Sequence, residues 1–238
     1  MLISGLLKTT LLDYPEHVAA TVFLGGCNMC CPFCHNSSLV FSPKPAYTLE
    51  ELMHFLKKRA SILEGVCITG GEPTIYPELP EFLKPIKALG YSIKLDTNGT
   101  NPEMISSLAS QHLIDYVAMD VKLPFHEYKT QLGYSGSEKV LIESLHLLLS
   151  DIIPYELRTT VVKELHTPKR IHAMGEELKG AGKLYLQNFI DSGSVIKPNL
   201  HSVSENTLRE YQDILKAYIP NTYIRGEQSS SGSSTSRT

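Results

Sequence analysis

Three absences in this 238-residue sequence each exclude a large class of proteins. No apolar run approaches the roughly 18 residues of a membrane span, so we expect no membrane protein. The net charge is −3, whereas nucleic-acid binding calls for a basic face. The first residues also lack the pattern of a secretory signal peptide, because Lys8, Thr9 and Thr10 interrupt the leucines.

Cysteine is scarce, and its distribution is informative. Four of the five cysteines lie within the eight residues from Cys27 to Cys34, which is not the pattern of a secreted disulfide framework. In a reducing compartment such clustering favours metal binding. We therefore expect a cytoplasmic metalloprotein. The remaining cysteine, Cys67, lies within a strand-like run, where a free thiol packs as a small hydrophobe.

A fourth metal ligand is also missing. Cys27, Cys31 and Cys34 have the spacing C-x3-C-x2-C directly after an apolar, strand-like run. Structural zinc sites and ferredoxin clusters each use four ligands. Three thiolates can instead hold three corners of an iron–sulfur cube and leave the fourth iron open for chemistry. His35 is a poor fourth ligand, because adjacent residues rarely bend back onto one metal.

Strand-like and helix-like segments alternate along the rest of the chain. The capping box of Thr48 and Glu51 opens one helix. We expect strands over 65–69, 91–96, 115–122, 155–162 and 183–189, and helices over 77–89, 102–111, 137–149, 168–179 and 204–218. Such a repeat predicts an α/β fold, with parallel strands joined by right-handed crossovers.

Three of these strands carry polar residues on one face. The residues are Ser92, Lys94 and Asp96, then Asp120 and Lys122, then Glu156, Arg158 and Thr160. A parallel sheet covered on both faces would be apolar throughout, so we expect the polar face to line a wet cavity. A curved, partly open barrel of six strands meets this requirement. Its active site would lie at the carboxyl ends of the strands, where Cys27, Gly70–Glu72, Asp96 and Asp120 lie.

The cysteine triad, with Phe33 before its last cysteine, resembles the signature of radical S-adenosylmethionine (SAM) enzymes. The stretches 5–15, 18–27 and 34–36 are similar to the branch that activates glycyl-radical enzymes, and the similarity extends to about residue 190. The resemblance implies a partial (β/α)6 barrel with helices outside, a [4Fe–4S] cluster on Cys27, Cys31 and Cys34, and SAM as the second cofactor. Cys30 would break the spacing of the family. We expect one core domain over residues 1–225 and a disordered, serine-rich tail over 226–238.

The resemblance also implies how SAM is bound. Gly70, Gly71 and Glu72 match a family motif that receives the methionine ammonium, although the same residues with Pro73 could simply form a tight turn. Phe33 adjoins the cluster. Arg158 is expected to bind the SAM carboxylate through its guanidinium fork, with an internal ion pair to a barrel acid as the alternative.

Two aspartates are expected to end neighbouring strands. Asp96 and Asp120 would bring two negative charges together, and such a pair needs a counter-charge or a proton. Lys122 is one candidate. A monovalent cation is another, since Asp96, Thr97, Met119 and Asp120 match such a site in similar activating enzymes. Lys122 would then be free to contact the carboxylate or ribose of the substrate.

The activity that the resemblance implies is an oxidoreductase reaction. An electron from flavodoxin or ferredoxin enters the cluster, SAM is cleaved to methionine and a 5′-deoxyadenosyl radical, and that radical takes a hydrogen from a glycine of a partner enzyme. We favour the anaerobic ribonucleoside-triphosphate reductase as partner over pyruvate formate-lyase. This preference rests on the stretch 5–15 and the compact loop after Cys34, which resemble the reductase-activating proteins more closely. The sequence departs from the family at the sixth strand, where the pyruvate formate-lyase activators carry a histidine and this chain has Gln187, which faces inward by alternation and is offered as a hydrogen-bonding replacement. The alternatives are a small-molecule radical enzyme of the deazaguanine-forming kind and a non-enzymatic iron–sulfur or zinc protein.

Overall fold

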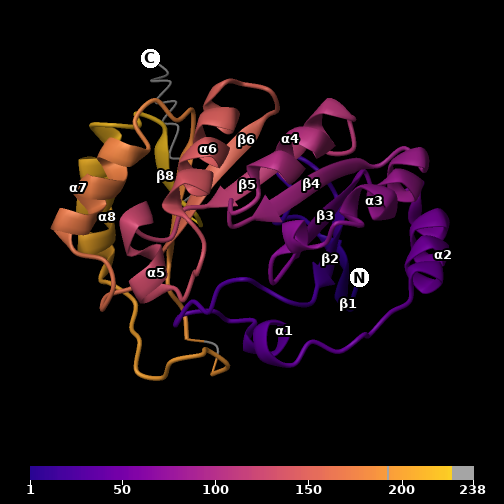
Figure 1. Cartoon of the computed structure of the whole chain (residues 1–238), viewed down its shortest axis with the longest axis horizontal. Coiled ribbons are helices and arrows are strands. Elements are labelled where there is room, and N and C mark those ends of the chain that lie inside the picture. Colours follow the sequence, from indigo (N-terminus) through magenta and orange to yellow (C-terminus); the bar gives the residue numbers. More distant parts are fainter. Residues whose placement is uncertain (192, 227–238) are drawn as a thin grey trace, which may run out of the picture.

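The computed structural model describes residues 1–191 and 193–226 of the chain (Figure 1). The tail predicted to be disordered, 226–238, lies outside this range except for Gly226, so that prediction and the domain boundary at residue 225 stay predictions. Within the described residues, no helix is long and apolar enough to cross a membrane.

A single open, curved sheet forms the centre of the molecule. Its eight strands lie in chain order, so every strand is paired with the next strand along the chain. β1 is antiparallel to β2, and all later pairs are parallel. The strands are β1 Ile3–Thr10, β2 Ala19–Leu24, β3 Gly65–Gly70, β4 Ser92–Thr97, β5 Tyr116–Asp120, β6 Tyr155–Val161, β7 Leu184–Asn188 and β8 Thr222–Ile224.

Helices connect the parallel strands and lie on the outside of the sheet (Figure 1). The longer ones are α2 Leu49–Arg59, α3 Leu79–Ala88, α4 Pro102–Ser110, α6 Glu138–Leu149, α7 Pro168–Glu177 and α8 Glu205–Lys216. Shorter turns are α1 Ser37–Phe41, η1 Pro73–Ile75, η2 Phe125–Glu127 and α5 Tyr128–Gln131. The predicted capping box is present, because Thr48 and Glu51 bond each other's backbone amides at 2.8 and 3.1 Å.

The fold prediction is confirmed: β2 to β7 supply the six parallel strands of a partial barrel, and β8 adds a seventh parallel strand at the edge of the sheet. Within the described residues, the sequence analysis missed six elements: β1, β8, α1, α5 and the short turns η1 and η2. One predicted strand, 115–122, ends two residues early at Asp120. The strand ends there because the backbone of Lys122 bonds buried side chains instead of a neighbouring strand, with its amide donating to the Tyr128 hydroxyl at 2.9 Å.

The polar inner face of the sheet differs from the prediction in its lower part, away from the carboxyl ends of the strands. Lys94 and Glu156 are fully buried below the carboxyl ends of the strands, so the expected wet cavity does not extend this far. Ion pairs compensate their burial. Lys94 pairs with Asp96, and Glu156 accepts from Arg225 at 3.0 Å. Charged groups of the inner face are therefore fixed to one another before any ligand is considered.

Candidate active site

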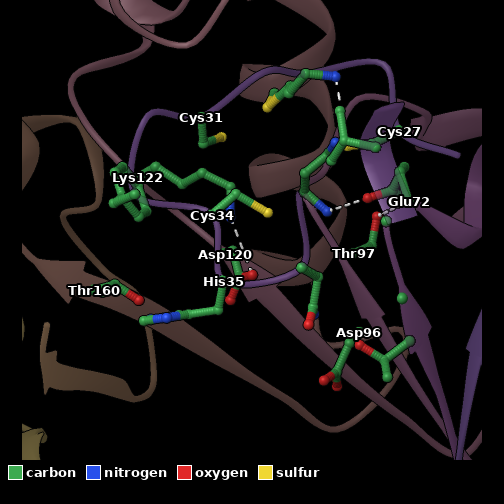
Figure 2. Close-up of a pocket in the computed structure, with 18 of the residues that line it drawn as sticks. Cys27, Cys31, Cys34, His35, Glu72, Asp96, Thr97, Asp120, Lys122 and Thr160 are labelled. Carbon is green, nitrogen blue, oxygen red and sulfur yellow. Dashed lines mark hydrogen bonds and ion pairs between the residues drawn. The ribbon is translucent and has the colours of Figure 1, made fainter. Parts of the chain in front are cut away.

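A cavity of about 230 Å³ opens at the carboxyl ends of the parallel strands (Figure 2). Of the residues predicted as site residues, only Met119 is absent from its lining, and its side chain is fully buried. The predicted residues that line the cavity are Cys27, Cys31, Phe33, Cys34, Gly70, Gly71, Glu72, Asp96, Thr97, Asp120, Lys122 and Arg158. Residues up to 131 positions apart in the chain, Cys27 to Arg158, thus meet at one place.

The three cysteines lie on one loop, residues 25–36, which we call the cysteine loop. It follows β2 and is tied down by backbone hydrogen bonds from Gly25 to Leu2 at 2.9 Å and from Gly26 to Leu39 at 2.7 Å. The Cys30 amide bonds the Leu132 carbonyl at 2.8 Å, and this cysteine is exposed. Because Cys30 is not part of the cavity lining, the cavity offers three thiols and not four.

Burial makes these thiols weak acids. It raises the pKa of Cys27 to about 11 and that of Cys31 to about 12, and it also raises the pKa of Cys34. The positive charge of Lys122 opposes the rise at all three. Binding of a metal would therefore release protons from the loop.

The donor set fits an iron–sulfur cluster better than a single ion. Three soft sulfur donors surround the cavity, and thiolates select iron–sulfur clusters, copper(I) or zinc. Among the residues that the structure describes, no three His, Cys, Asp or Glu side chains are grouped to hold one ion. A structural zinc ion would need four converging ligands.

Gly70 and Gly71 bring the end of β3 against the cysteine loop. The Gly71 amide donates to Leu24 at 2.9 Å, and the next amide donates to Gly26 at 2.8 Å. A Cβ on Gly70 would lie 2.1 Å from the Leu24 carbonyl oxygen, and one on Gly71 would lie 2.0 Å from that of Gly26. We predicted close approach to a ligand. The structure shows that the glycines are first required for two backbone segments to touch.

Glu72 joins this turn to the end of β4. Its carboxylate is 1% exposed and accepts from the Thr74 amide at 3.1 Å and hydroxyl at 2.6 Å, from the Thr97 hydroxyl at 2.7 Å and from the Asn98 amide at 2.6 Å. Burial raises the pKa of Glu72, and these bonds oppose the rise. Three of the four bonds go to Oε1, so Oε2 keeps acceptor capacity toward the cavity.

Arg158 supplies the counter-charge that the paired aspartates require. Its Nε donates to Asp120 at 2.8 Å and its Nη1 to Asp96 at 3.0 Å. Lys94 adds a second partner to Asp96, and Lys122 adds one to Asp120 at 3.1 Å. Although burial alone would raise them, the adjacent cations hold the pKa values of both aspartates below their usual range.

This network bears on two predictions. The guanidinium fork of Arg158 is in an internal ion pair, which is the alternative interpretation, so a bound carboxylate would have to compete for it. Three cations, Lys94, Lys122 and Arg158, already surround the two aspartates, so there is no excess negative charge that a monovalent cation would need to neutralise. The Thr97 hydroxyl already donates to Glu72 and accepts from Gly99 at 3.1 Å. The cation site stays a prediction.

Other contacts at the cavity were not predicted from the sequence. The His35 ring stacks on Phe189, with centroids 5.4 Å apart. The Lys197 amide donates to the Pro32 carbonyl at 2.8 Å, so the segment after β7 touches the cysteine loop. Gln187, offered as a replacement for a family histidine, is not among the lining residues.

Comparison with known proteins agrees with this geometry. Residues 21–166, more than half of the chain, match the model of the Radical SAM superfamily. The chain belongs to the radical SAM superfamily. It is therefore an enzyme of radical SAM type, and membership implies a [4Fe–4S] cluster and SAM as its cofactors.

Two relatives differ in how much of this radical SAM enzyme they match. It is 34% identical over 231 residues to a protein of Methanocaldococcus jannaschii named as a candidate glycyl-radical enzyme activating enzyme, covering 94% of this chain and 95% of that one. It is 39% identical over 104 residues to the 7-carboxy-7-deazaguanine synthase of Neisseria meningitidis, covering 44% and 43%.

The fold recurs in a solved structure of low sequence identity. A domain of the pyruvate-formate lyase-activating enzyme of Bacteroides vulgatus matches with a TM-score of 0.53 and 18% identity, over 68% of this chain and 99% of that one. This likeness confirms the predicted partial barrel. The predicted family, fold and cofactors are thus confirmed, while the roles of individual cavity residues stay predictions.

Proposed function

We propose that this radical SAM enzyme is an activating enzyme that generates a glycyl radical on a partner protein. One observation carries the proposal: the similarity to the Methanocaldococcus jannaschii relative extends over almost the whole of both chains. The similarity to the deazaguanine synthase covers less than half of either chain. A full-length match supports a shared reaction better than a match over the common core does.

The cavity supports a substrate that is itself a macromolecule. A small-molecule enzyme needs an interior specificity pocket. Here the lining consists of the cysteine loop, the Gly70–Glu72 turn and the inner ends of strands, which are the parts assigned to the cofactors. A partner protein would bring its own reactive glycine on a loop that swings out of the folded domain, by transient binding and a local change of order.

We assign the following roles to residues of this chain. Cys27, Cys31 and Cys34 hold the cluster. Gly70, Gly71 and Glu72 present backbone carbonyls and one carboxylate oxygen to the methionine ammonium, while Lys122, which pairs with Asp120 at 3.1 Å, is the cation assigned to a carboxylate or ribose. When bound, the cluster and SAM supply reductive cleavage of a carbon–sulfur bond and hydrogen-atom abstraction.

Within this proposal the favoured partner is the anaerobic ribonucleoside-triphosphate reductase. The stretch 5–15 and the short connection after Cys34 support it, because both resemble the activating proteins of that enzyme. Flavodoxin or ferredoxin is the proposed electron donor. The clustered free cysteines suit a cytoplasmic location.

The test is to mix the reconstituted, reduced enzyme and SAM with each candidate partner under anaerobic conditions. We expect an electron paramagnetic resonance doublet from a glycyl radical in one partner, and collapse of that doublet when the glycine Cα hydrogens are replaced by deuterium. If neither partner yields a radical, and a small molecule instead accelerates methionine release, the second candidate function replaces the first.

That second candidate is a small-molecule radical enzyme of the deazaguanine-forming kind. The partial similarity to 7-carboxy-7-deazaguanine synthase favours it. It predicts that a purine-like substrate, and no protein, accelerates methionine release.

A further inference from the structure

The backbone of Lys122 is held by side chains and not by a neighbouring strand. It lies two residues beyond the end of β5, where no neighbouring strand pairs with it. Its amide donates to the Tyr128 hydroxyl at 2.9 Å, and its carbonyl accepts from His166 Nε2 at 3.0 Å. Tyr128 and His166 are 1% and 2% exposed. Both backbone polar groups of this residue are thus held by buried side chains.

The bond from His166 requires a hydrogen on Nε2, because the Lys122 carbonyl can only accept. His166 Nδ1 lies 3.0 Å from the Val162 amide and 3.2 Å from the Val162 carbonyl, and in the neutral ring it is the acceptor for that amide. Burial lowers the pKa of His166 to about 4, which keeps the ring neutral at physiological pH. His166 is held in turn through its own carbonyl, which accepts from the Tyr211 hydroxyl of α8 at 2.9 Å.

The residue before Lys122 is held as well. The Thr159 hydroxyl donates to the Val121 carbonyl at 2.7 Å, and the Val121 amide donates to the Arg158 carbonyl at 2.8 Å. The backbone from Val121 to Lys122 therefore has little freedom. A rigid backbone at this point limits where the Lys122 ammonium can go.

The side chain that carries this ammonium shares a cavity with the three thiols. The Lys122 side chain is 15% exposed and lines the cavity with Cys27, Cys31 and Cys34. In the view of Figure 2 it extends beside Cys31 and Cys34 with its nitrogen directed at Asp120. A cation near an iron–sulfur cluster stabilises the reduced, more negative form, and nearby charge is one of the determinants of cluster potential.

We propose that Tyr128 and His166 are positioning residues that hold the Lys122 ammonium at the cavity lined by the three thiols, and that they set the reduction potential of the cluster through it. Neither residue lines the cavity. Neither belongs to a sequence motif of the site, and His166 is the last residue of the matched family region.

The test is the midpoint potential of the reconstituted cluster, measured by redox titration. We expect Lys122→Met to lower the equilibrium constant for one-electron reduction about tenfold, which corresponds to about 59 mV for one electron. Tyr128→Phe and His166→Ala are each expected to lower the same equilibrium constant about threefold. The effect is smaller because Lys122 keeps its charge and loses only its fixed position. His166→Gln keeps an N–H donor and is expected to restore most of the wild-type potential.

A double-mutant cycle separates positioning from a general loss of structure. In a Lys122→Met background, Tyr128→Phe is expected to change the potential no further. Tyr91→Phe is the matched control, since Tyr91 is also buried and its hydroxyl donates to the Leu56 carbonyl at 2.7 Å, away from the cavity. It should lower thermal stability to a similar degree and leave the potential unchanged.

Two results would overturn the proposal. One is an unchanged potential in Tyr128→Phe and His166→Ala while Lys122→Met shifts it. The other is a shift from Tyr128→Phe that is equally large with and without Lys122. Tyr128→Phe removes one oxygen atom only, so the cycle remains decisive even where His166→Ala fails to fold.

Discussion

Two halves of the barrel build the cavity in different ways. In the first half, the cysteine loop and the Gly70–Glu72 turn meet backbone to backbone, and only glycine fits at the two crossing points. In the second half, side chains hold either backbone groups or one another, as Arg158 holds two aspartates. The first arrangement leaves a motif at fixed spacing. The second spreads its partners over long distances in the chain.

The sharpest test of the first half is the loss of a thiol. Replacing Cys27, Cys31 or Cys34 by Ala is expected to abolish the cluster and all SAM cleavage, because each thiol holds a separate iron. Iron content should fall from about four atoms per chain to none, with loss of visible absorbance. Cys30→Ala and Cys67→Ala are the controls and should keep the cluster. Retention in Cys31→Ala together with loss in Cys30→Ala would reverse the assignment of ligands.

The second half is tested most strongly at Arg158. Arg158→Met leaves Asp96 and Asp120 partly uncompensated, and because this network is partly exposed we expect a loss of about 1–3 kcal/mol in the free energy of unfolding, between the values for exposed and fully buried pairs. Urea denaturation at pH 7 measures this. Arg225→Met, which removes the guanidinium from buried Glu156 below the cavity, is the matched control and should leave SAM cleavage unchanged. Equal effects of both variants on cleavage would mean that Arg158 acts through the fold alone.

The same variant has a predicted pH dependence. The folded-state pKa values of Asp96 and Asp120 are depressed, so the stability drawn from Arg158 is fully present above the unfolded pKa of about 3.9. It is lost as the pH falls below that value toward the folded pKa values. The gap in unfolding free energy between wild type and Arg158→Met should therefore shrink as the pH falls below about 4. A gap that widens on acidification would contradict the assignment.

Gly71 tests the backbone contact of the first half. In Gly71→Ala the new Cβ meets the Gly26 carbonyl, so the cysteine loop must shift, and we expect a loss of about 1–3 kcal/mol in stability together with weaker cluster retention. Gly182→Ala is the control, because its Cβ meets no atom closer than 3.6 Å. A Gly71→Ala variant as stable as the control would show that the two segments need not touch.

The smallest expected effect is at Tyr211, at the far end of the second half. Tyr211→Phe removes the hydroxyl that donates to the His166 carbonyl, and one such hydrogen bond contributes about 1 kcal/mol to stability. Iron content should stay as in wild type. A loss of iron as complete as in the cysteine variants would show that the second half holds the cluster directly.

The contrast between the halves also explains what could be predicted from the sequence. Periodicity and capping residues were enough to predict the strands β2 to β7 and the main helices, because those signals are local. The three-residue strand β8 and the antiparallel β1 carry no comparable pattern and depend on the sheet they join. The cysteines and the Gly70–Glu72 turn were predicted from motifs. Tyr128 and His166 could not be, because hydrogen bonds to a backbone place no constraint on spacing in the chain.

The sequence analysis gave an internal ion pair of Arg158 only as an alternative. Alternation places Arg158 on the inner face of the sheet but does not say which acidic residue it contacts. Asp96 lies 62 residues away and Asp120 lies 38 away. Only the register of β4, β5 and β6 brings the three together.

The central claim is that this enzyme takes a hydrogen atom from a glycine of a partner protein. The most direct test uses the proposed reductase partner with deuterium at its glycine Cα positions, incubated with the reduced enzyme and SAM, followed by mass spectrometry of the 5′-deoxyadenosine formed. We predict that 5′-deoxyadenosine carries one deuterium, at a yield that follows the glycyl radical signal. Release of unlabelled 5′-deoxyadenosine alone, at the same rate with and without the partner, would contradict the account.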